Sequence, residues 1–400
     1  MDEHVLTTYR RAEEVFVEGR GATVLDAQGK EYLDFLSGIA VSALGHAHPE
    51  LTAALQDQAG KLLHVSNLFR HPYTEEVAQR IAHLTGLEAC FFSNSGAEAV
   101  EAALKIARKH HRDSGHRERT WFVALEGSFH GRTLGALSVT HTEKYRKPFG
   151  PLLDGVTFVA PGDGEALERA IHPHAGAKPA ALILEPIQGE SGVRELPAEF
   201  LRLARRLCNE TGTVLIHDEV QCGSGRTGHF LAAQAAGVVP DIVTLAKPIA
   251  AGLPMGVTVV DKHLAGTLEP GDHGSTFAGG PFVLRAALVF LKLVDKGGLL
   301  EQVRARGQQL RRGLESIERD FPVVAELRGR GLMQGMRLEH GAEELQQDLY
   351  HRGLIVNRTA GDVIRLLPPY VITAAQVDRG LDLLREGLHA LDRKEIQTTR

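Results

Sequence analysis

Short apolar runs alternate with helical stretches through the middle of the chain. They cover residues 89–92, 120–125, 156–160, 180–184, 213–216, 242–245 and 256–260. Runs that are nearly continuous, rather than alternating with polar residues, are typical of strands buried on both faces of a parallel sheet. The pattern predicts an α/β protein whose larger domain contains a mostly parallel, seven-stranded sheet.

The two ends of the chain have a different pattern. The first residues indicate a polar helix, residues 22–35 a β-hairpin that turns at Gly29, and residues 49–63 and 73–84 two helices. Beyond Pro281, helices are expected at 282–295, 301–320, 343–352 and 373–391, with a strand pair at 353–357 and 363–367. We therefore expect residues 1–55 to join a small α+β domain, residues 56–282 to form the large domain, and residues 283–400 to form the small domain.

Composition narrows the class of protein. The 400-residue chain is 43% hydrophobic and 24% charged, with a formal net charge of −5, as is ordinary for a soluble globular protein. This charge gives no reason to expect nucleic acid or an anionic membrane as a partner. No apolar run approaches a membrane span, and the first residues lack the apolar core of a signal peptide.

The cysteines and histidines bear on the location of the protein and on metal binding. An odd number of cysteines without metal-binding spacing favours a reducing compartment, and so a cytoplasmic location. These residues are Cys90, Cys208 and Cys222. Two His-x-His pairs, His46/His48 and His172/His174, lack an accompanying set of carboxylates or thiolates. We interpret them as loop histidines and expect no metal site.

Chemistry is expected at the carboxyl ends of the strands, because ligands of open α/β sheets bind there. Lys247 follows the run at 242–245, and a buried ammonium needs a partner or a covalent use. Taken alone, Lys247 is more simply a lysine whose side chain reaches solvent. Asp218 follows the run at 213–216, where it could pair with a protonated pyridine nitrogen or cap the next helix.

Two further strand ends suit a planar, phosphorylated ligand. Ser95, Gly96 and Ala97 fall at a predicted helix N-terminus, where free N–H groups bind phosphate, although an ordinary N-cap by Ser95 is the simpler interpretation. Phe129 could stack on a ring and Arg132 could bind a carboxylate. A core phenylalanine beside a surface arginine would give the same pattern.

A carboxylate follows another buried strand. Glu185 comes directly after the run at 180–184 and needs a cationic partner, for which Arg365 is one candidate. No single feature is decisive, but their order is informative. A phosphate site, an aromatic ring, a strand-end acid and then a strand-end lysine together meet the requirements of pyridoxal 5′-phosphate (PLP).

With these motifs in place, the chain resembles a fold-type I, class III aminotransferase. The resemblance covers about residues 22–391, and its most specific stretches are LIHDEVQCGSGRTG at 215–228 and DIVTLAK at 241–247. Within the class, residues 38–49, 64–69, 127–133 and 185–190 resemble acetylornithine aminotransferases. The resemblance implies the PLP-dependent transferase fold, a PLP cofactor, and a homodimer with shared active sites.

The resemblance also implies roles at the cofactor. Lys247 is implied to bind PLP as a Schiff base, with Asp218 on the pyridinium nitrogen. Val220 is implied to pack on the ring, with Gln221 near its phenolic oxygen. The other implied contacts to the cofactor are Ser95, Gly96, Ala97, Phe129, Glu219 and Thr276.

Four residues are implied to serve the substrate. Arg132 matches the arginine that binds a substrate carboxylate, and Ser275 matches a substrate contact. Ser275 and the phosphate contact Thr276 are implied to come from the neighbouring subunit. Glu190 matches a gating carboxylate that pairs with Arg365.

Two departures from the family pattern carry information. Pro248 follows the lysine where the family has a small residue, and a proline is expected to hold Lys247 in an extended conformation. Ornithine δ-aminotransferases have a tyrosine near the position of Ile39. Its absence argues against free ornithine as the preferred donor.

The implied reaction moves the δ-amino group of N2-acetyl-L-ornithine to 2-oxoglutarate, giving N-acetyl-L-glutamate 5-semialdehyde and L-glutamate, as in arginine biosynthesis. Within the class, succinylornithine, a carrier-bound lysine precursor and 4-aminobutyrate are alternative donors. A mutase on the same scaffold would need no 2-oxoglutarate. A non-catalytic homologue would have lost Lys247 or Asp218, and both are present.

Overall fold

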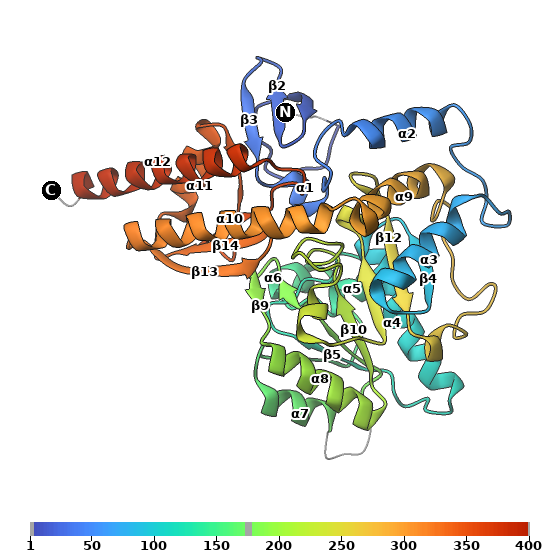
Figure 1. Cartoon of the computed structure of the whole chain (residues 1–400). Coiled ribbons are helices and arrows are strands. Elements are labelled where there is room, and N and C mark those ends of the chain that lie inside the picture. The colour runs from blue at the N-terminus through green and yellow to red at the C-terminus, as the bar shows by residue number, and fades with distance from the viewer. Residues whose placement is uncertain (1–3, 173–177, 399–400) are drawn as a thin grey trace.

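A seven-stranded sheet forms the centre of the larger part of the molecule (Figure 1). It is seen in a computed structural model that describes residues 4–172 and 178–398. The strand order is β4-β12-β11-β10-β7-β5-β6, and within this sheet β12 is the strand that runs antiparallel to its neighbours. The strands are β4 (Ala89–Ser93), β5 (Phe122–Leu125), β6 (Val156–Val159), β7 (Ala181–Leu184), β10 (Val214–Asp218), β11 (Ile242–Leu245) and β12 (Gly256–Val260). The predicted α/β class and all seven runs are confirmed.

Helices cover both faces of this sheet, which explains why its strands are apolar throughout. On one face α4 (Gly96–Asp113) packs against a cluster that includes Ile183 of β7. On the other face α7 (Gly164–Ile171) and α8 (Ala198–Thr211) pack against Leu182 and Leu184 of the same strand. Neighbouring side chains of one strand point to opposite faces, so both need an apolar partner.

The N-terminal segment forms a small sheet with the C-terminal region. The strands β1 (Phe16–Arg20), β2 (Thr23–Asp26) and β3 (Glu31–Asp34) are antiparallel, and β3 pairs in parallel with β15 (Leu354–Ile355). The hairpin around Gly29 is confirmed. The predicted N-terminal polar helix is wrong: residues 16–20 form a strand, because Phe16 packs edge-on against Tyr32 of the hairpin.

The C-terminal region adds a second antiparallel sheet and three long helices. The sheet order is β13 (Val324–Arg330), β14 (Met333–Leu338), β17 (Val363–Leu366) and β16 (Asn357–Thr359), and the helices are α10 (Leu299–Asp320), α11 (Ala342–His351) and α12 (Ala374–Thr398). The predicted strand at 353–357 is divided. Its first part, β15, pairs with β3, and the chain then continues into β16, which pairs with β17.

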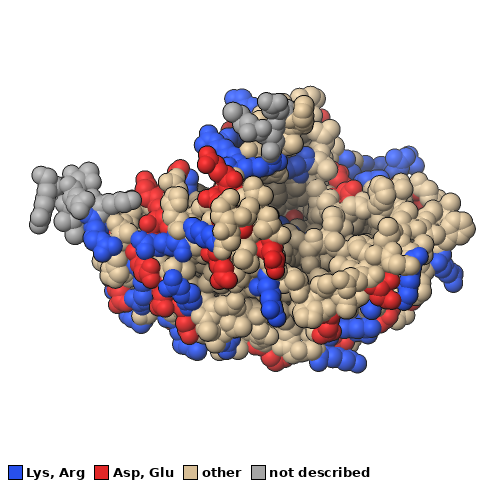
Figure 2. Space-filling model, turned by 90° about the horizontal axis from the view of Figure 1, so that it is seen from above, with Lys and Arg blue, Asp and Glu red and all other residues tan. Residues whose placement is uncertain are grey.

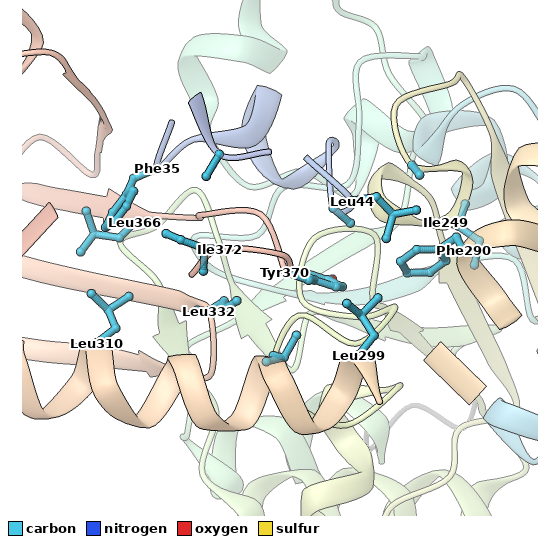
Figure 3. Close-up of a cluster of buried hydrophobic side chains, with 14 of the residues drawn as sticks. Phe35, Leu44, Ile249, Phe290, Leu299, Leu310, Leu332, Leu366, Tyr370 and Ile372 are labelled. Atoms are coloured by element: carbon cyan, nitrogen blue, oxygen red, sulfur yellow. The ribbon is translucent and has the colours of Figure 1, made fainter. Parts of the chain in front are cut away.

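One buried apolar cluster joins these parts (Figure 3). It includes Phe35 after β3, Ile249 after β11, Phe290 of α9 (Pro281–Lys296), Leu310 of α10, and Tyr370. Helix α9 also packs against α2 (Pro49–Ala59) and α3 (Tyr73–Thr85). Since α9 lies between the two parts, the domain boundary near residue 282 stays a prediction. Within the described ranges, no helix is both long and apolar enough to cross a lipid bilayer.

Gly256, at the start of β12, lies against the turn that precedes α4. A Cβ atom at Gly256 would stand 2.1 Å from the backbone oxygen of Ser95. We predict that Gly256→Ala lowers the free energy of unfolding by about 1–3 kcal/mol, because a backbone atom cannot move aside as a flexible side chain can. Urea denaturation measures this change. Gly266→Ala is the control, since nothing lies within 4 Å of a Cβ there; an equal loss in both variants would contradict the prediction.

Candidate active site

A cavity of about 430 Å³ opens at the edge of the sheet where the carboxyl ends of the parallel strands meet. Side chains and turns that follow β4, β5, β7, β10 and β11 all line it. Nine residues predicted from the sequence to serve the site are among them. They are Ser95, Gly96, Ala97, Phe129, Arg132, Asp218, Val220, Gln221 and Lys247.

Lys247 follows β11, and its half-buried side chain faces this cavity. Its Nζ forms no hydrogen bond with any of the described residues. Enclosure by protein atoms lowers the pKa of Lys247, and the negative charges of Glu190 and Asp218 oppose this effect without cancelling it. A larger fraction of Lys247 is therefore a neutral amine than for a lysine in water.

The backbone at Lys247 is not extended, which corrects the expectation drawn from Pro248. Its φ is +42°, in the left-handed region that L-residues rarely adopt. Pro248 then lies in the first turn of the short 3-10 helix η3 (Lys247–Ala250), where Ile249 N donates to Ala246 O at 3.1 Å. A proline suits this place, because its fixed φ matches a helical turn and no N–H is needed.

Asp218 ends β10, and its carboxylate is held by three neighbours. Oδ1 accepts hydrogen bonds from Val220 N at 3.0 Å and from Thr244 Oγ1 at 3.2 Å. Oδ2 lies 2.7 Å from Nδ1 of His130, which is buried. His130 is a site residue that the sequence analysis missed, although it lies directly after Phe129 in the same loop. The contact leaves Nε2 of His130 buried without a hydrogen-bond partner in the described structure.

The N-terminus of α4 faces the same cavity from β4. Ser95 is the N-cap, and its Oγ accepts a hydrogen bond from Glu98 N at 3.2 Å. The N–H groups of Gly96 and Ala97 come next and lie at the positive end of the helix dipole. A Cβ at Gly96 would stand 2.8 Å from Val220 Cγ1. Glycine at this position thus lets the helix start approach the side chain of Val220.

The loop after β5 places an aromatic ring and an arginine at the cavity. Phe129 is half-buried and Arg132 is exposed. The guanidinium of Arg132 lies over the ring of Tyr145, with Cζ 3.6 Å from the ring centroid, and 5.5 Å from the ring of Phe129. Arg132 forms no hydrogen bond or ion pair with any residue in the described ranges.

A second arginine lies behind Gln221 and is fully buried. Nη1 of Arg365 donates to Glu190 Oε1 at 2.6 Å, to Gln221 Oε1 at 2.9 Å and to Gly189 O at 3.0 Å. Burial would raise the pKa of Glu190, but Arg365 and Gln221 outweigh it and lower the pKa. The predicted contact between Glu190 and Arg365 is therefore present.

Glu185 has a different environment from the one expected. Arg365 is not its partner; instead Oε1 accepts from Phe129 N at 2.9 Å and Oε2 from Gly189 N at 3.3 Å. Glu185 thus connects the loop that carries Phe129 with the loop that leads to Glu190. Burial raises the pKa of Glu185 to about 7, with a further contribution from Asp218 that His130 opposes.

Three residues predicted to serve the site lie elsewhere. The carboxylate of Glu219 accepts hydrogen bonds from Ala232 N and Ala233 N, so it faces the 3-10 helix η2 (Ala232–Ala236) and does not line the cavity. Ser275 and Thr276 line a separate surface depression. Ser275 still lies next to the cavity, because its Oγ accepts a hydrogen bond at 2.8 Å from Nδ2 of Asn94, a lining residue.

The sequence predicts that the paired histidines are ordinary loop residues. His46 Nε2 lies 2.9 Å from Asp34 Oδ2, and His172 Nε2 lies 3.9 Å from Glu210 Oε2. His174 lies outside the described residues. Each of these two rings therefore has a protein carboxylate within 4 Å.

Comparison with known proteins places this geometry in a family. Residues 8–388 match the family described as aminotransferase class-III. An acetylornithine aminotransferase of Methanosarcina mazei is 44% identical over 96% of this chain and 94% of its own length. The crystal structure of an ornithine aminotransferase from Toxoplasma gondii has a TM-score of 0.93 at 32% identity, covering 98% of this chain and 94% of that one. That of N-acetylornithine aminotransferase from Stenotrophomonas maltophilia has a TM-score of 0.84 at 34% identity, covering 96% and 98%.

The buried carboxyl of Glu185 predicts a pH dependence of stability. Its pKa of about 7 lies above the value of 4.5 that applies to an exposed glutamate. Between these pH values the folded chain keeps a proton that the unfolded chain has lost, so a rise in pH favours unfolding. We predict that the free energy of unfolding of the wild type falls, relative to Glu185→Gln, from about pH 4.5 to about pH 7.

Chemical denaturation at a series of pH values measures this difference. The exposed Glu126 of the neighbouring loop provides the control, since Glu126→Gln should keep the pH dependence of the wild type. A difference between the wild type and Glu185→Gln that is constant with pH would contradict the prediction.

Proposed function

This chain belongs to the class III aminotransferase family, and from this premise we propose that it transfers the δ-amino group of N2-acetyl-L-ornithine to 2-oxoglutarate. The observation that carries the proposal is the meeting of Lys247 and Asp218 in one cavity. The acyl group is proposed from relatives such as the acetylornithine aminotransferase of Methanosarcina mazei, which matches over 96% of this chain. Ile39, where ornithine δ-aminotransferases have a tyrosine, supports an acylated donor over free ornithine.

The cavity fits PLP, which we propose as the cofactor. The free N–H groups of Gly96 and Ala97 suit its phosphate, and the face of Phe129 suits its ring. Asp218 would pair with the ring nitrogen, and Lys247 would hold the cofactor covalently. When bound, PLP supplies a ring that withdraws electrons from the carbon next to the reacting nitrogen.

Lys247 has the chemistry for proton transfer. Its lowered pKa leaves Nζ able to accept a proton from the δ-carbon of the donor and to return it. The carboxylate of Asp218 would face the ring nitrogen, and His130 fixes the orientation of that carboxylate through the 2.7 Å contact with Oδ2. Nε2 of His130, a residue that lines the cavity, is buried and has no hydrogen-bond partner among the described residues.

Two different substrates have to use this one cavity. Arg132 is exposed and pairs with no carboxylate of the described residues, so it suits the carboxylate that both substrates carry. Arg365 is paired with Glu190 at 2.6 Å. We propose that this pair stays closed for N-acetylornithine and opens for glutamate or 2-oxoglutarate, whose second carboxylate would replace Glu190 on Arg365.

We further propose that the working form is a homodimer. Asn67 Nδ2 donates to the backbone oxygens of Ser275 and Ala278, both at 3.1 Å, so the segments around these residues lie side by side. Large apolar side chains are exposed on them: Leu62, Leu63, Leu68, Phe69 and Phe277. Figure 2 shows broad areas without charged side chains on one face of the molecule. A second copy would cover such a surface and bring Ser275 and Thr276 to its partner's cavity.

Replacing Lys247 tests the catalytic proposal. We predict that Lys247→Ala lowers kcat by about 10²–10⁴-fold, because the proposed proton transfer uses Nζ of Lys247, which the variant lacks. The measurement is glutamate formation from N-acetylornithine and 2-oxoglutarate by the PLP-loaded enzyme. Wild-type rates with succinylornithine, free ornithine and 4-aminobutyrate test the donor, and a preference for 4-aminobutyrate would refute it. Turnover by Lys247→Ala at the wild-type rate would refute the mechanism.

Replacing Glu190 tests the proposed exchange of carboxylates. In Glu190→Gln the charge that holds Arg365 is lost, so we predict that the KM for glutamate falls and the KM for N-acetylornithine rises. The ratio of the KM for N-acetylornithine to the KM for glutamate should therefore rise about threefold to tenfold. Steady-state kinetics in both directions measures the ratio. Glu195→Gln, at a half-buried carboxylate of β9 (Arg194–Glu195) that pairs with Arg330, should leave the ratio unchanged. An unchanged ratio in Glu190→Gln would count against the gate.

A further inference from the structure

Tyr145 is a residue that neither the sequence motifs nor the proposed reaction assigns. It lies on the short helix α6 (Glu143–Arg146), outside the cavity, and is half-buried. Its ring forms the surface on which the guanidinium of Arg132 rests, with Cζ 3.6 Å from the ring centroid. The ring of Phe129 stands nearly perpendicular to it, at 89° and 6.4 Å. Arg132 is thus in contact with two aromatic rings at the cavity.

Contact through a ring face leaves the guanidinium able to bind a ligand. A cation held over an aromatic ring uses its planar face, while its N–H groups point outward along the edges. A protein carboxylate would instead occupy those edges, as Glu190 does on Arg365. Arg132 has no such partner in the described structure, so its N–H edges remain free for a carboxylate from outside.

The helix that presents Tyr145 is itself anchored. The next residue, Arg146, lies over the ring of Phe158 of β6, with Cζ 4.8 Å from the centroid. His141, just before the helix, packs edge-on against the same ring at 5.1 Å. Arg146 and His141 therefore connect α6 to the central sheet. Because α6 is held in place, the ring of Tyr145 restricts the orientation of the exposed Arg132 side chain.

We propose that Tyr145 is a positioning residue that holds Arg132 in the orientation in which it binds the α-carboxylate of the amino donor. This inference rests on the proposed function, since it takes Arg132 as the carboxylate site. It adds a requirement that the donor be an anion at this end of the cavity. It also assigns the effect to the ring of Tyr145 and not to its hydroxyl, which forms no hydrogen bond with the described residues.

Binding of an inert analogue to the PLP-loaded enzyme tests the proposal without turnover. N-acetyl-L-norvaline keeps the carboxylate and acyl group of N-acetylornithine but lacks the δ-amine. Calorimetry should give a Kd that is roughly three- to tenfold higher in Tyr145→Leu than in the wild type. Tyr145→Phe keeps the ring and should match the wild type within about twofold. In an Arg132→Leu background, Tyr145→Leu should cause no further change, because the two residues act as a unit.

Kinetics with a matched pair of donors separates positioning from general damage. N-acetylputrescine is N-acetylornithine without its carboxylate. In Tyr145→Leu the KM for N-acetylornithine should rise roughly three- to tenfold, while kcat and the KM for N-acetylputrescine stay within about twofold. Equal changes for both donors, or an equal loss in Tyr145→Phe, would overturn the proposal.

Failure of the proposed donor has a different signature. The wild type would then neither bind N-acetyl-L-norvaline nor turn over N-acetylornithine. Glutarate, the carbon skeleton of 2-oxoglutarate and glutamate, would serve as the anionic probe in the same set of variants. A glutarate Kd that is unchanged in Tyr145→Leu would then overturn the role of Tyr145 as well.

Discussion

Charge balance around one enclosed amine is the constraint on which the site depends. Lys247 lies in a cavity where burial disfavours its charged form, yet Glu190 and Asp218 favour it. Each of these carboxylates is engaged by another group, Glu190 by Arg365 and Asp218 by His130. The pKa of Lys247 is lowered because burial outweighs the two carboxylates, and the positive charge of Arg365 adds to the lowering.

Arg132 at the cavity and Arg365 behind it are held by different physical means, and this difference fits the two substrates that we propose. Arg365 is fully buried and its Nη1 is bound to Glu190, so a ligand can reach it only when that carboxylate moves. Arg132 is exposed and rests on the ring of Tyr145, which leaves its N–H edges open. An ion pair can be exchanged for another carboxylate, whereas stacking on a ring can persist when a carboxylate binds. In the proposed reaction, Arg365 would act as a switch and Arg132 as a constant anchor.

Much of the fold could be predicted, because burial on both faces leaves a local signal. Residues 180–184 are apolar throughout, and within them β7 (Ala181–Leu184) places Leu182 and Ile183 on opposite faces. The strand-end position of Lys247 and Asp218 followed from the same pattern. The N-terminal strand β1 was missed, because its support comes from Tyr32 and the hairpin and not from its own polar sequence.

The sequence by itself determined the sheet, the strand ends that carry Lys247 and Asp218, and the helix N-terminus at Gly96, since each depends on neighbouring residues. Only the tertiary structure decided which groups meet across long separations. It placed His130 on Asp218, 88 residues apart, and joined Glu185 to backbone N–H groups instead of to an arginine. It also set the left-handed φ of Lys247 ahead of Pro248. Such contacts arise from packing of distant segments, which no local pattern of apolar and polar residues encodes.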